Sequence, residues 1–261
     1  MEKIDFYYFS GTGNTLLVAK KMVEIFEKED IITNLYRIED SDPLKIDLNH
    51  IIGLAFPVSE FSTYDFVWKF IKSFPESKGT KIFMVDTLGG VSGGIVGPLR
   101  KILQNKGYEP IGAKEIIMPL NIFYIEDNEI NEKKIKKGLV VAEEYALSLI
   151  NGESYWGRIP FLSDSVYYTS ISALKLTSFN IYQKLLHLDV NKDKCNKCEQ
   201  CIELCPINNI NNGDDGYPVY LRNCVYCQRC TSFCPRGAIS VPFNYKGKTY
   251  RAVNVKEILK S

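Results

Sequence analysis

The sequence predicts an α/β fold, with a doubly wound parallel sheet over residues 1–150 and a smaller α+β domain behind it. Two observations predict this arrangement. Apolar, strand-like segments alternate with helix-like segments through the first 150 residues, and that alternation gives parallel strands joined by helical crossovers. All eight cysteines of the 261-residue chain then lie between Cys195 and Cys234, so the C-terminal part must be organised differently.

Composition and charge exclude several classes of protein. Hydrophobic residues make up 45% of the chain and charged residues 24%, as in ordinary folded proteins. A net charge of +1 gives no overall field for nucleic acid or for a membrane surface. No apolar run approaches the roughly 18 residues of a membrane span, and the N-terminal residues lack the pattern of a signal peptide. We therefore expect a cytoplasmic protein with little histidine chemistry, since His50 and His187 are its only histidines.

The elements of the sheet can be placed in order. Strands are expected at 4–9, 31–36, 51–56, 81–87 and 115–118, and helices after Asn14 and at 64–74, 94–106 and 130–150. The continuous apolar run at 51–56 is typical of a strand covered on both faces. Gly107 supplies the cap that ends the helix before it. Five alternating strands of this kind predict the strand order 2-1-3-4-5.

A glycine-rich turn joins the first strand to the first helix. It consists of Ser10, Gly11, Thr12, Gly13, Asn14 and Thr15. A helix N-terminus after such a turn binds anions through its backbone N–H groups and its dipole. A dinucleotide site would place a third glycine where Leu16 stands, and a nucleoside-triphosphate loop would contain Gly-Lys-Ser/Thr. The hydroxyl-rich turn instead suits a terminal phosphate monoester, and a plain capped turn is the alternative.

This turn resembles the phosphate loop of flavodoxins, and the resemblance implies flavin mononucleotide (FMN). In a doubly wound sheet the ligand lies beyond the carboxyl ends of the strands, between strands one and three. Two further loops reach that point, and their candidate contacts are Pro57, Val58, Ser59, Phe61, Thr87, Leu88, Gly89 and Gly90. We expect Phe61, Tyr64 or Leu88 to stack on the flavin ring, with ordinary packing as the alternative for each.

The cysteines form two copies of one spacing. Cys195, Cys198, Cys201 and Cys205 read C-x2-C-x2-C-x3-C and precede Pro206; Cys224, Cys227, Cys230 and Cys234 repeat the pattern before Pro235. This is the bacterial iron–sulfur spacing, in which the fourth cysteine binds the other cluster. Zinc ribbons use two C-x2-C pairs and leave the third cysteine without a role, and four disulfides would require export.

The spacing assigns each cysteine to one of two [4Fe-4S] clusters. Cys195, Cys198, Cys201 and Cys234 are expected to bind one cluster, and Cys224, Cys227, Cys230 and Cys205 the other. Residues 191–241 resemble two-cluster bacterial-type ferredoxins. An apolar shell around the clusters is expected from Ile207, Ile210, Val219, Ile239 and Val241.

The whole chain resembles the EFR1-type flavodoxin–ferredoxin fusions. The resemblance rests on residues 7–15 and the cysteine pattern, and also on 87–90, 118–121 and 250–253. It implies a flavodoxin-like FMN domain at 1–150 and a two-cluster ferredoxin domain with a C-terminal tail at 191–261. Residues 151–190 read as a helical linker, with a helix at 165–188 that docks the two domains or offers a surface to a partner.

These cofactors predict an electron carrier that works with a redox protein partner. Loaded clusters would make the cysteine-rich domain anionic, so a partner with a positive patch is expected. The alternative is a flavin-dependent reductase of a small organic acceptor or quinone, with a pocket lined by Phe61, Phe123 and Tyr124. Feeding electrons to another metalloenzyme, or sensing redox state, is a third possibility. No nicotinamide site is visible in the sequence.

Overall fold

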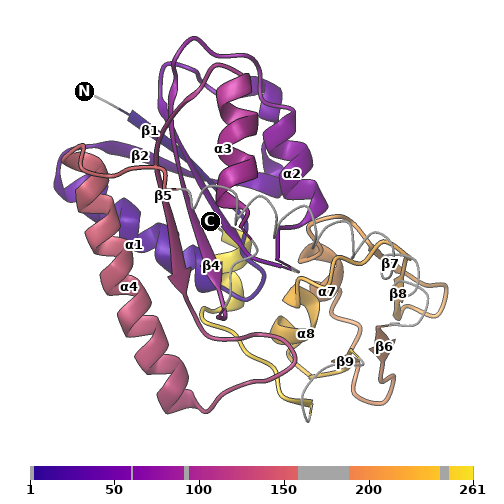
Figure 1. Cartoon of the computed structure of the whole chain (residues 1–261). Helices are drawn as coiled ribbons and strands as arrows, with labels where there is room; N and C mark the ends of the chain where they lie inside the picture. The colour runs from indigo at the N-terminus through magenta and orange to yellow at the C-terminus, as the bar shows by residue number, and fades with distance from the viewer. Residues whose placement is uncertain (1–2, 60, 91–93, 158–187, 242–246, 261) are drawn as a thin grey trace.

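The computed structural model describes residues 3–59, 61–90, 94–157, 188–241 and 247–260. Its main feature is a five-stranded sheet, which Figure 1 shows running through the centre of the molecule. The strands are β1 (Lys3–Tyr8), β2 (Ile32–Arg37), β3 (Ile51–Pro57), β4 (Lys81–Leu88) and β5 (Glu109–Ile117). All pairs are parallel and the order is β2-β1-β3-β4-β5, so the predicted doubly wound topology is confirmed.

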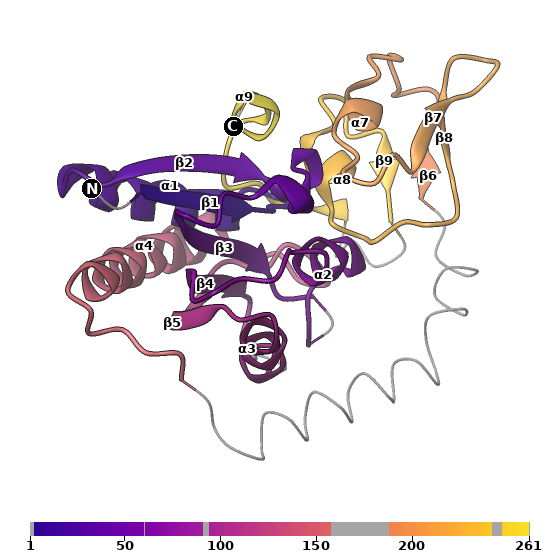
Figure 2. The same cartoon turned by 90° about the horizontal axis from the view of Figure 1, so that it is seen from above.

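Two helix pairs cover the two faces of the sheet. Helices α1 (Asn14–Lys28) and α4 (Asn128–Ile150) share one apolar core with the residues of one sheet face. Helices α2 (Asp65–Lys72) and α3 (Val96–Asn105) pack in a second core on the other face, and Figure 2 shows the two pairs on opposite sides. Strand β5 begins at residue 109, earlier than expected. The expected start at residue 115 was too late because β5 is a half-exposed edge strand whose polar residues interrupt the apolar pattern.

The cysteine-rich region is built from much shorter elements. Strand β6 (Asp189–Val190) pairs with β9 (Ile239–Ser240), and β7 (Ile210–Asn212) pairs with β8 (Pro218–Tyr220), both antiparallel. Helices α7 (Gln200–Glu203) and α8 (Arg229–Phe233) follow the two groups of closely spaced cysteines. This small α+β unit lies beside the carboxyl ends of the sheet strands (Figures 1 and 2). Of its expected apolar shell, Ile210, Ile239 and Val241 are buried, but Val219 is 48% exposed.

The end of the chain returns to the sheet. Ile258 in the last helix, α9 (Val255–Lys260), is buried in the core that contains α1. Lys20 pairs with Glu257 at 2.8 Å, and Arg37 donates to the carbonyl oxygen of Ile258 at 2.9 Å. The helix expected at 165–188 lies, except for its last residue, outside the described residues. None of the helices that the structure describes is long and apolar enough to cross a membrane.

Candidate cofactor sites

Three loops meet at the carboxyl edge of the sheet, as the strand order requires. The hydroxyl groups of Thr15 and Thr87 are 2.8 Å apart, which joins the glycine-rich turn to the loop after β4. The N–H of Val58 donates to the carbonyl oxygen of Thr87 at 2.8 Å, which joins the loop after β3 to the same point. Pro57 lies opposite Thr87 in the sheet register. The candidate residues of all three loops are therefore neighbours.

The glycine-rich turn has the features of an anion cradle. Ser10, Thr12 and Thr15 are each only 1% exposed, and the N–H of Gly13 donates to the Ser10 hydroxyl at 3.1 Å. Gly13 has a φ of 104°, a conformation that favours glycine. The N-cap residue of α1 is Gly13, which has no side chain to bond the N–H groups of the first turn, so those groups can serve an external acceptor. This donor set fits a phosphate group.

Contacts that the sequence did not indicate hold this cradle from outside. Asn121 donates to the hydroxyl oxygen of Thr12 at 3.1 Å. The side chain of Asn14 donates to the carbonyl oxygen of Pro119 at 2.8 Å and accepts from the Tyr250 hydroxyl at 2.6 Å. Both polar atoms of the Asn14 side-chain amide are thus bonded within the protein, and these contacts fix the side chain against the segments around 119 and 250. The segments 118–121 and 250–253 were noted only through the family resemblance.

The residues expected to stack on the flavin have different surroundings. Phe61 is 50% exposed and has a φ of 61°, whereas Leu88 is buried. Tyr64 packs edge-on against Phe9, with 5.3 Å between ring centroids. Phe61 is therefore the most accessible of the three for a planar ligand. Ser59 forms paired backbone hydrogen bonds with Ser62.

The two expected glycines of the loop after β4 differ in the space around them. A Cβ on Gly89 would lie 2.1 Å from the side chain of Leu120, so this backbone is tightly packed. A Cβ on Gly90 would meet nothing within 4 Å among the described residues. Residues 91–93 of the same loop lie outside the described part of the chain.

The structure groups the eight cysteines around two cavities. One cavity is lined by Cys205, Cys224, Cys227 and Cys230, which we call the inner set. The other is lined by Cys195, Cys198, Cys201 and Cys234, which we call the outer set. Each cavity holds about 410 Å³ of non-atom space, including space open to solvent. In both sets the fourth cysteine comes from the other sequence motif.

The thiols of both sets are free and could serve as ligands. All eight cysteines are free of disulfides. Backbone N–H groups point at the sulfur atoms of Cys205 (3.1 Å), Cys224 (3.4 Å) and Cys234 (3.3 Å), contacts that stabilise thiolates in iron–sulfur sites. Within the described residues, no three His, Cys, Asp or Glu side chains are arranged to hold a single metal ion. Each set encloses a cavity of the kind that fits a cluster.

Burial disfavours the thiolate form of four of the eight cysteines, three of which belong to the inner set. It raises the pKa of Cys224 to about 11 and that of Cys227 to about 12, and it raises the pKa of Cys230 well above its usual value. In the outer set, burial raises the pKa of Cys201 to about 11. Because a metal ligand must be the thiolate, cluster insertion would release these protons.

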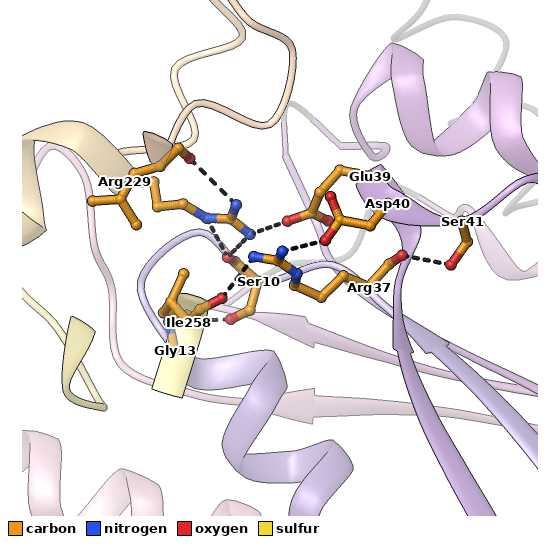
Figure 3. Close-up of polar contacts among 9 residues, drawn as sticks. Ser10, Gly13, Arg37, Glu39, Asp40, Ser41, Arg229 and Ile258 are labelled. Carbon is orange, nitrogen blue, oxygen red and sulfur yellow. Dashed lines mark hydrogen bonds and ion pairs between the residues drawn. The ribbon is translucent and has the colours of Figure 1, made fainter. Parts of the chain in front are cut away.

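Arg229 was not singled out in the sequence, although it lies between two ligand cysteines. Its Nε and Nη2 donate to the carbonyl oxygen of Ser10 at 3.1 Å and 2.8 Å, and Nη1 donates to that of Leu204 at 3.3 Å. Nη2 also lies 2.7 Å from Oε1 of Glu39, and both side chains are almost fully buried. Figure 3 shows the guanidinium between the Ser10 turn and the Glu39 carboxylate. Its position directly before Cys230 was the one feature of the sequence that could have indicated a role for Arg229.

A second unexpected group is the carboxyl of Asp86 in β4. It is fully buried, and neither oxygen has a hydrogen-bond partner among the described residues. Burial raises its pKa well above the usual value, and nearby Glu115 raises it further. Burial therefore favours the protonated form of Asp86 inside the sheet. An acidic residue within an apolar strand was the available signal.

Comparison with known proteins separates the two parts of the chain. Residues 194–239 match the 4Fe-4S dicluster domain family. That match covers only the cysteine-rich region. A search of curated proteins gives no match to this chain.

Several solved flavodoxins are similar to the N-terminal part. Oxidised flavodoxin 2 from Bacillus cereus is 17% identical, with a TM-score of 0.45 over 57% of this chain and 98% of its own. Two-electron reduced flavodoxin from Megasphaera elsdenii is 20% identical, with a TM-score of 0.38 over 53% of this chain and 98% of its own. These similarities are low, and the flavodoxin-like fold is established by the strand order and helix layers themselves. One polypeptide thus joins a flavodoxin-like sheet to a region that matches a dicluster domain.

Proposed function

We propose that this protein carries electrons between two [4Fe-4S] clusters and one FMN within a single chain, and exchanges them with a redox protein partner. The proposal rests on one observation. The cavity lined by the four inner thiols is next to the hydroxyl-lined turn at the start of α1, because Arg229 lines that cavity and donates to the carbonyl oxygen of Ser10. An iron–sulfur cluster exchanges single electrons and a flavin one or two, so the pair can split or merge electron pairs. The chain's own residues hold both groups and set their spacing.

The residues divide between the two groups as follows. The inner and outer cysteine sets would each hold one cluster, with ligands exchanged between the two motifs. Ser10, Thr12, Thr15 and the first N–H groups of α1 would hold the FMN phosphate. The loops 57–61 and 87–90 would border the ring. The proposed domains are 1–150, a linker at 151–190, and 191–261, with the last helix packed back on the sheet.

We also infer that the chain is related to the EFR1-type flavodoxin–ferredoxin fusions and works in the reducing cytoplasm, where free thiols persist. The balance of six basic and five acidic residues over 191–240 supports a partner with a positive patch, because each loaded cluster adds negative charge.

The test is anaerobic purification followed by a visible spectrum and by counts of iron, sulfide and flavin. We expect about eight iron atoms per chain, from two four-iron sites, together with one FMN. Colourless protein, or zinc in place of iron, would contradict the proposal.

A second candidate is a flavin-dependent reductase of a small organic acceptor. The favouring observation is the exposure of Phe61 (50%), Phe123 (68%) and Tyr124 (50%), since exposed aromatic side chains can border an open substrate site. Turnover of a quinone by protein whose outer set is mutated, lost when flavin is removed, would support this function over that of a carrier.

A further inference from the structure

We propose that Arg229, paired with Glu39, is a positioning residue that docks the inner cysteine set on the FMN phosphate loop and places its guanidinium next to the inner cluster. This inference rests on the proposed function. It assigns a specific residue to the junction between the two cofactor sites.

The first argument is geometric. The Arg229 guanidinium donates two hydrogen bonds to one acceptor, the carbonyl oxygen of Ser10, which opens the phosphate loop. The same side chain donates to the carbonyl oxygen of Leu204, the residue before Cys205. Arg229 therefore ties the loop to both sequence motifs that supply the inner set. Figure 3 shows its contact with Ser10. A lysine could not make this planar, forked set of contacts.

The second argument is the closeness of the two backbones. A Cβ on Gly11 would lie 2.2 Å from the carbonyl oxygen of Cys227. The inner set therefore touches the phosphate loop without an intervening side chain. Cys198 of the outer set, by contrast, is exposed. The inner site is thus the one next to the flavin site.

The third argument concerns charge. Arg229 and Glu39 are 3% and 4% exposed, and the Arg229 guanidinium also lies over the Phe9 ring at 4.8 Å. A charge in this environment is poorly screened by water. Its field reaches the inner set, since Arg229 lies two residues after Cys227 and directly before Cys230, and all three line the same cavity. A positive charge beside a cluster favours the reduced form, which carries one more electron.

The test uses the full-length holoprotein and three variants: Arg229→Gln, Arg229→Lys and Glu39→Gln. The matched control is Arg222→Gln, because Arg222 is exposed and two residues from Cys224. Two quantities are measured: the affinity of the flavin-stripped protein for FMN, by fluorescence quenching, and the reduction potential of each cluster, by titration followed with electron paramagnetic resonance. The inner signal is identified as the one retained in Cys198→Ala.

We expect Arg229→Gln to weaken FMN binding by about tenfold, because a charged hydrogen-bond set on the loop is lost, and to lower the potential of the inner cluster only. Arg229→Lys should keep that potential close to wild type but still bind FMN more weakly. Glu39→Gln should raise the inner potential, since the positive charge is no longer balanced. Arg222→Gln should change neither quantity.

Equal shifts of both clusters in Arg229→Gln, or no difference between Arg229→Gln and Arg222→Gln, would overturn the inference. If Arg229→Gln does not fold, the other two variants decide the matter. An inner potential that stays close to wild type in Arg229→Lys and rises in Glu39→Gln supports the inference, and an unchanged inner potential in Glu39→Gln overturns it. Wild-type protein without FMN or clusters would instead contradict the proposed function, so the two failures are distinguishable.

Discussion

The two cysteine motifs have the same spacing in the sequence, but the inner and outer sets that they form have different surroundings in the fold. In the inner set, Cys227 is 8% exposed and its carbonyl oxygen faces Gly11 of the phosphate loop. In the outer set, the equivalent Cys198 is exposed, and the short motif around it lies at the surface. Spacing therefore specifies what each set can bind, whereas its position relative to the sheet specifies what that site can exchange electrons with.

This difference gives the two sites different roles in the proposed carrier. The inner site contacts the phosphate loop, so it is placed to exchange electrons with a flavin. The outer site is exposed, so it is placed to exchange electrons with a partner protein. The short elements of the cysteine-rich region also share their core with the sheet, because Leu204 and Phe233 belong to the apolar cluster that contains α1. The cysteine-rich region and the sheet therefore pack directly against each other through this shared apolar core.

The largest expected effect comes from removing one cysteine of each set. Cys198→Ala and Cys227→Ala are a matched pair, since each is the second cysteine of its motif. Each variant should lose about four iron atoms per chain. Cys198→Ala should keep its FMN, whereas Cys227→Ala should also lose FMN, because its loop forms a wall of the phosphate site. Iron and flavin counts after anaerobic purification test this, and equal flavin loss in both variants would break the comparison.

Local patterns allowed much of this architecture to be predicted. The alternation of apolar strands and helices predicted the strand order. The cysteine spacing predicted two sets of four cluster ligands, which stays a prediction, and the four cysteines of each set line one cavity. The contacts across the junction could not be predicted. Arg229, Glu39 and Tyr250 come from distant parts of the chain, and no local pattern links a buried arginine to the carbonyl oxygen of Ser10. Tyr64, one of the residues expected to stack on the flavin, packs edge-on against Phe9.

A smaller effect is expected when the contact between the inner set and the loop is crowded. Gly11→Ala places a Cβ 2.2 Å from the carbonyl oxygen of Cys227, so one of the two backbones must move. We expect a loss of about 1–3 kcal/mol in the free energy of unfolding, as for other overpacked sites. Gly90→Ala is the control, because no atom of the described residues lies within 4 Å of the added Cβ. Equal stability of the two variants in denaturant titrations would mean that the inner set does not press on the loop.

Asp86 gives a pH effect that belongs to the sheet and to neither cysteine set. Its pKa is raised in the folded protein, so the folded state holds a proton that the unfolded state releases above about pH 4. The stability is therefore complete below that pH and falls as the pH rises toward the folded pKa. Asp86→Asn should flatten this slope and raise the melting temperature at pH 8, whereas Asp193→Asn, at an exposed position, should not. If the dependence of stability on pH were unchanged in Asp86→Asn, the raised pKa of Asp86 would be contradicted.

The smallest effect is kinetic and compares the two sets directly in cluster-free protein. At pH 8, iodoacetamide should label Cys198 about tenfold or more faster than Cys227, because Cys227 is covered and its pKa is raised to about 12. Labelling of Cys224 and Cys201, whose pKa values are raised to about 11, should accelerate about tenfold per pH unit between pH 8 and 10 as the thiolate fraction grows. Mass spectrometry of the labelled peptides gives each rate. Labelling of Cys227 as fast as Cys198 would show that the inner set is open to solvent without its cluster, and the asymmetry between the sets would then have to come from the bound clusters rather than from the polypeptide.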